Sequence, residues 1–158
     1  MKKLGILAVL LLAGIGYMIF KPGPSDAELI KAALKDSIEA GKEGRPGSVL
    51  DLLSRNFTVN EEFAGGRANI AKFIRESKPN LTIENPEPNV SGVSATIDSP
   101  ARIELRFPAV GFNVREVNLK FRKESGTSFL IFPTKVWKLE SATVPPEVVT
   151  ELASQVQM

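Results

Sequence analysis

The distribution of apolar and polar residues divides the chain into three parts. Residues 4–20 (LGILAVLLLAGIGYMIF) contain no charged residue. From residue 25 to residue 79 apolar residues recur at helical spacing, and after Pro79 they alternate with polar ones. Alternation with a period of two is typical of strands that bury one face. We therefore expect an apolar segment, then helices, then a sheet.

The apolar run of residues 4–20 predicts a transmembrane helix. At about 1.5 Å of rise per residue it covers roughly 25 Å, the low end of what crosses a bilayer core. Lys2, Lys3 and Lys21 flank the run and can reach the headgroups. No A-x-A cleavage site follows it, which favours an uncleaved anchor over a signal peptide. The preceding lysines place the N-terminus in the cytoplasm and the remaining chain on the periplasmic side of a bacterial envelope.

A pilin or pseudopilin would also begin with an apolar helix, and Gly5 stands where such a protein is processed. Two features oppose this alternative. Leu10 occupies the position at which the family carries glutamate, and the Pro-Gly-Pro sequence of residues 22–24 breaks the helix that pilins continue into their domain. The pilin-like role is therefore the third of our three interpretations.

A long first helix is predicted directly after the hinge. Ser25 and Glu28 have the spacing of a capping box, and Gly41 is the expected C-cap. The inward face carries Ile30, Ala33, Leu34, Ser37 and Ile38. The opposite face carries charges of both signs, so we interpret this as a core helix and not as a membrane-surface helix.

Two shorter helices follow in the sequence. The first starts at Ser48 and has an apolar face formed by Val49, Leu50, Leu52 and Leu53. The next begins after the glycine pair at residues 65–66 and ends before Pro79, because a residue that precedes proline disfavours helical geometry. Its inward residues are Ile70, Phe73 and Ile74.

The second half of the chain predicts strands. Leu81 and Ile83 open a short one, and alternation marks residues 100–107 (PARIELRF) and, within residues 114–124 (VREVNLKFRKE), Val117, Leu119 and Phe121. A turn at residues 124–127 leads into residues 128–141, where Pro133 implies a bulge or an edge position. A short amphipathic helix carrying Val148, Val149, Leu152 and Val156 is expected after the sheet.

These elements predict an α+β protein. We expect an N-terminal transmembrane helix and then an α+β roll of about three helices packed on a curved antiparallel sheet. Residues 1–24 form the anchor and hinge, residues 25–144 the roll, and residues 145–158 a short C-terminal amphipathic tail.

Composition narrows the function. Apart from Lys2 and Lys3 the chain carries 18 basic and 18 acidic residues, which argues against a nucleic-acid partner because such binders have a basic excess. The chain has no cysteine and no histidine. This excludes disulfides, thiolate metal sites and a Ser-His-Asp hydrolase. We expect no metal, no cofactor and no enzymatic activity.

The chain resembles the nuclear transport factor 2-like superfamily, also called the cystatin-like roll. The similar segments are residues 26–41 (DAELIKAALKDSIEAG), 52–57 (LLSRNF), 65–77 (GGRANIAKFIRES), 114–124 and 135–141. The resemblance implies a curved sheet that wraps around the long helix and encloses an apolar cone. The candidate cone-lining residues are Phe57, Phe63, Phe73, Phe107, Phe121 and Trp137. Such residues are more often ordinary core.

The resemblance does not carry a catalytic site with it. Members similar to ketosteroid isomerase need a carboxylate base and a tyrosine or protonated acid, and the one tyrosine, Tyr17, lies in the apolar run. Dehydratase-like members use histidine and tyrosine. Glu61 and Glu62, beside Phe63, are the acids whose context points to a pocket mouth. A binder of small lipophilic ligands, or a degenerate enzyme that uses the cone, is therefore our second interpretation.

Our first interpretation is a membrane-anchored, non-catalytic scaffold or accessory subunit of a membrane protein complex. Residues 101–140 hold eight basic and four acidic residues, which favours an acidic partner surface or contact with a second copy in a homo-oligomer. Its partners would be the membrane and other envelope proteins. The candidate interaction face is Arg102, Glu104, Arg106, Glu116, Lys120, Arg122 and Lys138. The alternative for this face is a solvated surface whose cross-strand charge pairs keep the domain soluble.

We expect Leu11→Arg to reduce membrane insertion, because a charge at the centre of a span costs about 2.5 to 3.5 kcal/mol. The test is the fraction of full-length chain that resists alkaline extraction from membranes. Recovery of a soluble protein that begins near residue 22 would contradict the anchor.

Overall fold

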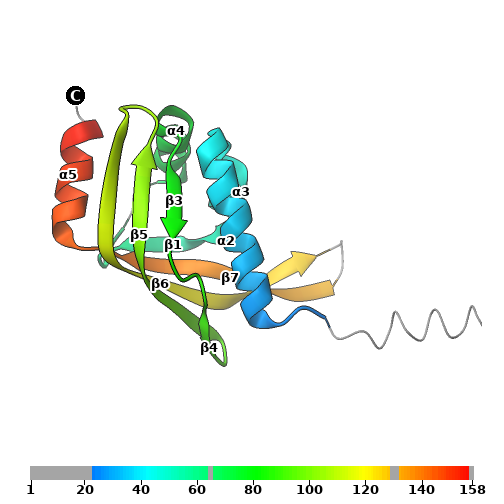
Figure 1. Ribbon diagram of the computed structural model, residues 1–158. Coiled ribbons are helices and arrows are strands. Elements are labelled where there is room, and N and C mark those ends of the chain that lie inside the picture. Colours follow the sequence, from blue (N-terminus) through cyan, green and yellow to red (C-terminus); the bar gives the residue numbers. More distant parts are fainter. Residues whose placement is uncertain (1–22, 64–65, 129–131, 157–158) are drawn as a thin grey trace, which may run out of the picture.

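The computed structural model describes residues 23–63, 66–128 and 132–156 (Figure 1). The described helices are α2 (Asp26–Glu43), α3 (Pro46–Leu52), α4 (Arg67–Ser77) and α5 (Pro146–Val156). The described strands are β1 (Leu53–Val59), β2 (Glu62–Phe63), β3 (Asn80–Ile83), β4 (Asn89–Ser91), β5 (Ser94–Leu105), β6 (Val110–Ser128) and β7 (Phe132–Thr143). The predicted anchor, residues 4–20, lies outside the described residues. Within them, no helix has both the length and the apolar character needed to cross a membrane.

Helix α2 begins as predicted. The Ser25 hydroxyl accepts the Glu28 backbone N–H at 3.3 Å, and the Glu28 carboxylate accepts the Ser25 N–H at 2.8 Å, so the capping box is confirmed. The helix ends at Gly44, whose φ of 74° suits glycine, and not at Gly41. Gly41 instead allows the backbone of Pro79 to pack closely against α2, because a Cβ at residue 41 would lie 3.1 Å from the carbonyl oxygen of Pro79.

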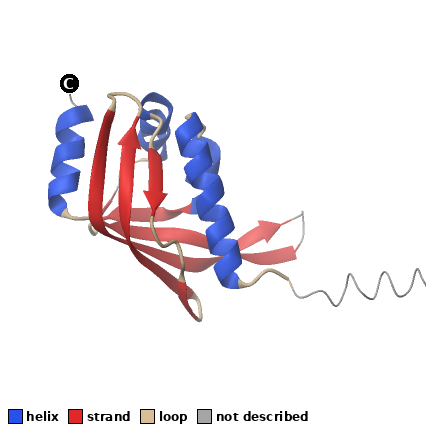
Figure 2. Cartoon of the chain, in the orientation of Figure 1, coloured by secondary structure: helices blue, strands red, loops and turns tan. Residues whose placement is uncertain are grey.

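The sheet is curved and mixed, with strand order β2-β1-β7-β6-β5-β3 and with β4 beside β5. The expected fully antiparallel sheet is wrong at one pairing, because β1 runs parallel to β7 and pairs Leu53 with Leu139. β1 and β7 are far apart in the chain, so no hairpin fixes their relative direction. In Figure 2, α5 is separated from the other helices by strands β5 and β6.

Two bulges interrupt the long strands. Ser99 pairs with Val117 and Ala101 with Val114, so residues 115 and 116 of β6 face the single residue Pro100 of β5. Proline has no N–H to give to a neighbouring strand and fits at such a bulge. A second shift, between Lys120 and Phe121, leaves one additional residue in β7. Bulges increase the bend of a strand, which agrees with the curvature of β6 in Figure 1.

The core lies between α2 and the concave face of the sheet. Ile30 of α2 and Phe121 of β6 are both 0% exposed. The same apolar cluster includes Leu34, Ile97, Leu119, Trp137, Leu139 and, from α5, Val148. Inward residues alternate along β5, β6 and β7, as the hydrophobic pattern predicts.

We expect Trp137→Ala to lower the free energy of unfolding by about 3 to 5 kcal/mol, since its ring is buried and truncation leaves a cavity. The measurement is denaturant unfolding of the protein. Phe107→Ala is the matched control, because Phe107 is 61% exposed, and it should cost less than about 1 kcal/mol. Equal losses for the two variants would contradict the assigned core.

Candidate functional site

The candidate cone-lining residues differ in their exposure. Phe121 and Trp137 are buried beneath α2, whereas Phe57 and Phe73 are half-buried. The side chain of Phe63 lies outside what the structure describes. Phe121 and Trp137 therefore belong to the packed interior between α2 and the sheet.

Phe107 does not line a cone. The alternation of residues 100–107 suggested that the strand continues to Phe107, but β5 ends at Leu105. The backbone N–H groups of Arg106 and Phe107 donate to the carbonyl oxygen of Ser77 at 2.8 and 3.4 Å, which ties this turn to the end of α4. The Phe107 ring lies in solvent as a consequence.

Glu61 and Glu62 lie at the hairpin that joins β1 and β2. Both are exposed, and Glu61 lies in the β1–β2 turn, where Asn60 and Glu61 have positive φ values of 51° and 68°. Such a pair of values is typical of a tight type I′ hairpin turn. Glu61 is therefore a turn residue, and Glu62 is the first residue of β2.

A carboxylate that the sequence did not single out reaches the edge of the concave face. Asp26, at the start of α2, accepts the Trp137 indole N–H at 2.9 Å and lies 2.8 Å from the Lys123 ammonium. Lys123 in turn lies 5.2 Å from the centre of the Trp137 ring. The hydrogen bond from Lys123, and then that from Trp137, lower the pKa of Asp26. An anion held in this way is a poor general base near neutral pH.

Only part of this cluster could be read from the sequence. Lys123 and Trp137 are cross-strand neighbours, and the register of the β6–β7 hairpin fixes that relation. The position of Asp26 depends on how α2 crosses the sheet, which no local pattern encodes. The cluster joins the beginning of α2 to the β6–β7 hairpin.

The predicted interaction face is largely a set of paired charges on the outer face of the sheet. Glu140 lies 3.3 Å from Lys120 and 3.0 Å from Arg122, and Arg102 lies 2.8 Å from Glu104. The Arg102 hydrogen bond lowers the pKa of Glu104. These pairs join three of the eight basic residues of 101–140 to two of its four acids, so the basic residues do not form one unpaired patch.

The remaining members of the face are spread over different places. Arg106 is exposed in the β5–β6 turn, and Glu116 is exposed at the bulge. The Lys138 ammonium donates to the backbone carbonyl of Asp51, at the end of α3. The structure therefore brings together Lys120, Arg122 and Glu140, and separately Arg102 and Glu104, but not the whole predicted set.

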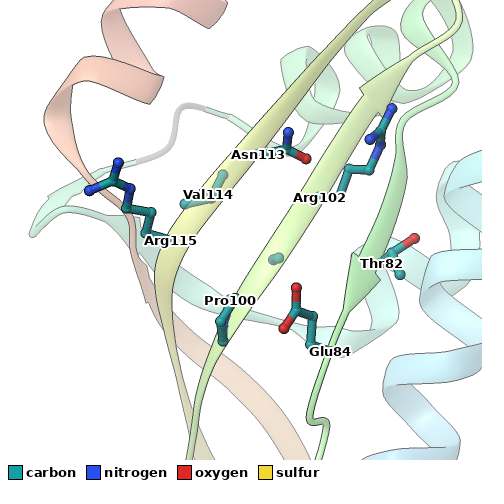
Figure 3. Close-up of a pocket in the computed structure, with 8 residues that line it drawn as sticks. Thr82, Glu84, Pro100, Arg102, Asn113, Val114 and Arg115 are labelled. Carbon is teal, nitrogen blue, oxygen red and sulfur yellow. The ribbon is translucent and has the colours of Figure 1, made fainter.

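A groove of about 500 Å³ crosses the outer face over β3, β5 and β6 (Figure 3). Thr82, Arg102 and Asn113 form one row across these strands, because each is the register partner of the next. The other residues that line the groove are Glu84, Pro100, Ala101, Val114 and Arg115. Its polar residues come from three strands, so the shape of the groove depends on the fold and not on one motif.

Glu84 and Arg115 lie on opposite sides of this groove (Figure 3). Both are exposed, and within the described part of the chain neither side chain has an ion-pair or hydrogen-bond partner. Arg115 is at the bulge opposite Pro100. The sequence offers one signal for it, since Val114 and Val117 are separated by two polar residues where strict alternation requires one.

Comparison with known proteins identifies the architecture. The structure is similar to a CaMKII hub from S. rosetta, with a TM-score of 0.56, 15% identity, and coverage of 78% of this chain and 98% of the hub. It is also similar to a nuclear transport factor 2-like superfamily protein from Salmonella enterica (TM-score 0.50, 12% identity, 72% and 85% covered). A third similar structure is a ketosteroid isomerase-like protein from Erwinia carotovora atroseptica (TM-score 0.50, 14% identity, 77% and 96% covered).

The domain has the nuclear transport factor 2-like fold. No protein-family model and no curated protein sequence matches the chain. At these identities the structural likeness concerns the fold alone. The function has to be argued from the residues of the nuclear transport factor 2-like domain itself.

We expect Asp26→Asn to lower the melting temperature at pH 7 and to have less effect in acid. The lowered pKa of Asp26 means that its contribution to stability is complete above about pH 4 and is lost as the pH falls through the folded-state pKa. The measurement is the melting temperature of both proteins across that range. Asp36→Asn, at an exposed residue of the same helix, is the control. A difference between wild type and Asp26→Asn that persists unchanged at pH 2 would contradict the ionic role.

Proposed function

We propose that this chain is a membrane-anchored, non-catalytic scaffold whose domain associates with a second copy through the outer face of its sheet. The observation that carries the proposal is the pair Glu84 and Arg115. These are opposite charges without partners among the described residues, on the two sides of one groove. Residues 4–20 would hold the domain at the periplasmic surface of the membrane.

Two-fold symmetry explains how such a pair is used. In a symmetric dimer each contact occurs twice, so Glu84 of one copy meets Arg115 of the other, and Arg115 of the first meets Glu84 of the second. The neighbouring charges are already neutralised within each copy, as between Arg122 and Glu140. The unpaired residues therefore decide which surfaces attract each other.

The anchor would favour this association. Two domains tethered to the same bilayer meet at a raised effective concentration, so that an interface too weak for solution becomes occupied at the membrane. The similarity to the CaMKII hub supports a role in association only through the shared fold.

A non-catalytic role is supported by the hydrogen bonds that hold Asp26 at the edge of the concave face. The Asp26 carboxylate accepts hydrogen bonds from Lys123 and Trp137, and the chain has no histidine. The conserved shape of a fold does not supply a reaction by itself, as one fold hosts many functions. The ketosteroid isomerase-like neighbour therefore does not assign an isomerase activity to this chain.

A second candidate function has an observation in its favour. A groove of about 310 Å³ lies between α2 and the β3 side of the sheet, with an apolar lining of Leu34, Ile38, Ile83 and Pro86. Lys35 lies at this groove and is exposed. Such an arrangement suits a lipophilic molecule with an acidic head. Binding of a fluorescent fatty acid that Lys35→Glu abolishes would favour this ligand-binding alternative.

The association is tested by exchanging charges. We expect Arg115→Glu and Glu84→Arg each to weaken self-association of the full-length protein by at least about tenfold, because each places like charges opposite each other. A mixture of the two variants should associate again, since every contact then joins opposite charges. The measurement is energy transfer between donor- and acceptor-labelled copies in nanodiscs or detergent.

Arg75→Glu is the control for these variants, because Arg75 is exposed on α4, away from the groove. It should associate like the wild type. If Arg115→Glu and Glu84→Arg also associate like the wild type, the outer face is not the interface. If both weaken association but their mixture stays apart, the reciprocal contact is wrong.

A further inference from the structure

Strand β7 has an open edge for part of its length. β1 pairs with β7 at Leu139, Ser141 and Ala142, whereas β6 pairs with it from Phe132 onward. Among the described strands, none lies beside residues 132–138 on the β1 side. In Figure 1 the two-stranded ribbon of β6 and β7 continues past α2. An edge of this kind presents unpaired backbone N–H and C=O groups.

A groove of about 300 Å³ runs between this edge and the helices α2 and α3. Its apolar lining is Ala33, Leu52 and Trp137, and the last two are buried. Strand residues Val136 and Lys138 form the other wall. The groove therefore combines a strand edge with an apolar floor.

The helical wall of the groove is acidic. Asp36 of α2 and Asp51 of α3 both line it and are both exposed. In the part of the chain that the structure describes, neither carboxylate has a cation or hydrogen-bond donor as partner. The Lys138 ammonium donates to the backbone carbonyl of Asp51 and forms no ion pair with either carboxylate in the described part of the chain.

We infer that this groove binds an extended segment of a partner protein that carries lysine or arginine at alternate positions. The segment adds to the sheet as a strand beside residues 134–138, which follow Pro133 and whose five positions span roughly 17 Å. Backbone hydrogen bonds to β7 supply affinity that is independent of sequence. Alternate side chains of an added strand point to the helical side, where Asp36 and Asp51 select basic residues.

A second copy of this chain is a poorer occupant of the edge. Pairing of two β7 edges would place Lys135 and Lys138 of one copy close to those of the other. Lysine residues on an edge strand oppose such edge-to-edge pairing of two copies. The groove is distinct from the outer-face groove, which lies over β3, β5 and β6.

The experiment uses the full-length protein and a nine-residue peptide that alternates lysine with valine. Trp137 is the only tryptophan of the chain and lines the groove, so its fluorescence reports binding directly. The comparison peptides carry glutamate in place of lysine, or N-methyl groups at alternate residues along one edge. Peptides methylated on each edge are tested, because only one edge can pair with β7.

We expect the lysine peptide to bind about tenfold more tightly than the glutamate peptide, the change that two exposed ion pairs produce. The double variant Asp36→Asn/Asp51→Asn should lose this preference, and Glu39→Gln, an exposed acid of α2 at another groove, should keep it. N-methylation of one edge should abolish binding. Arg115→Glu should bind the peptide normally, so that failure of the outer-face interface is seen separately.

Three results would overturn the inference. The first is an unchanged Trp137 fluorescence with every peptide. The second is equal affinity for the lysine and glutamate peptides. The third is binding that survives N-methylation of either edge, because it would show that the peptide does not pair with the backbone of β7.

Discussion

The packing of α2 across the concave face of β5, β6 and β7 is the contact on which the rest of the structure depends. Ile30 of α2 and Phe121 of β6 belong to the same apolar cluster and are completely buried. Burying one such side chain stabilises a fold by about 1.5 to 3 kcal/mol, and the cluster contains many of them. Successive side chains of a strand point to opposite faces of the sheet. The residues that face α2 therefore also determine which residues form the outer face.

The bulge at Pro100 keeps the apolar side chains of β6 on the inner face of the sheet along the whole strand. Phe112 and Val114 point inward before the bulge, and Val117, Leu119 and Phe121 point inward after it. Without the additional residue the inward set would be Glu116, Asn118 and Lys120, since a shift by one residue reverses every side chain. The same bulge leaves Arg115 on the outer groove without a partner among the described residues. The bulge that keeps apolar side chains in the core therefore also places Arg115 in the proposed interface.

Local signals predicted the elements that depend on local physics. The capping box of Ser25 and Glu28 marks the start of α2, and the alternation of Val117, Leu119 and Phe121 gives the inner face of β6. The features that were missed depend on contacts between distant residues. The parallel pairing of β1 with β7, the Asp26 cluster and the groove between Glu84 and Arg115 are all of this kind.

The exposure of Phe107 could not be predicted from the alternation of apolar and polar residues. Its position continues the alternation of β5, but hydrogen bonds to Ser77 end the strand before it. The basic residues of 101–140 likewise do not form the single face that was predicted, because Glu140 and Glu104 pair with three of them. In the proposed association, the charges that remain unpaired among the described residues make the contact.

The central claim is that Glu84 of one copy meets Arg115 of another. The chain has no cysteine, so single cysteines report this contact without background. The measurement is cross-linking by a short thiol-reactive bismaleimide, which spans the reach of the two long side chains, between Glu84→Cys and Arg115→Cys copies of the full-length protein mixed in one membrane. We predict a cross-linked dimer in the mixture and none with either variant alone. Absence of a cross-link in the mixture, or equal cross-linking of the separate variants, would contradict the claim.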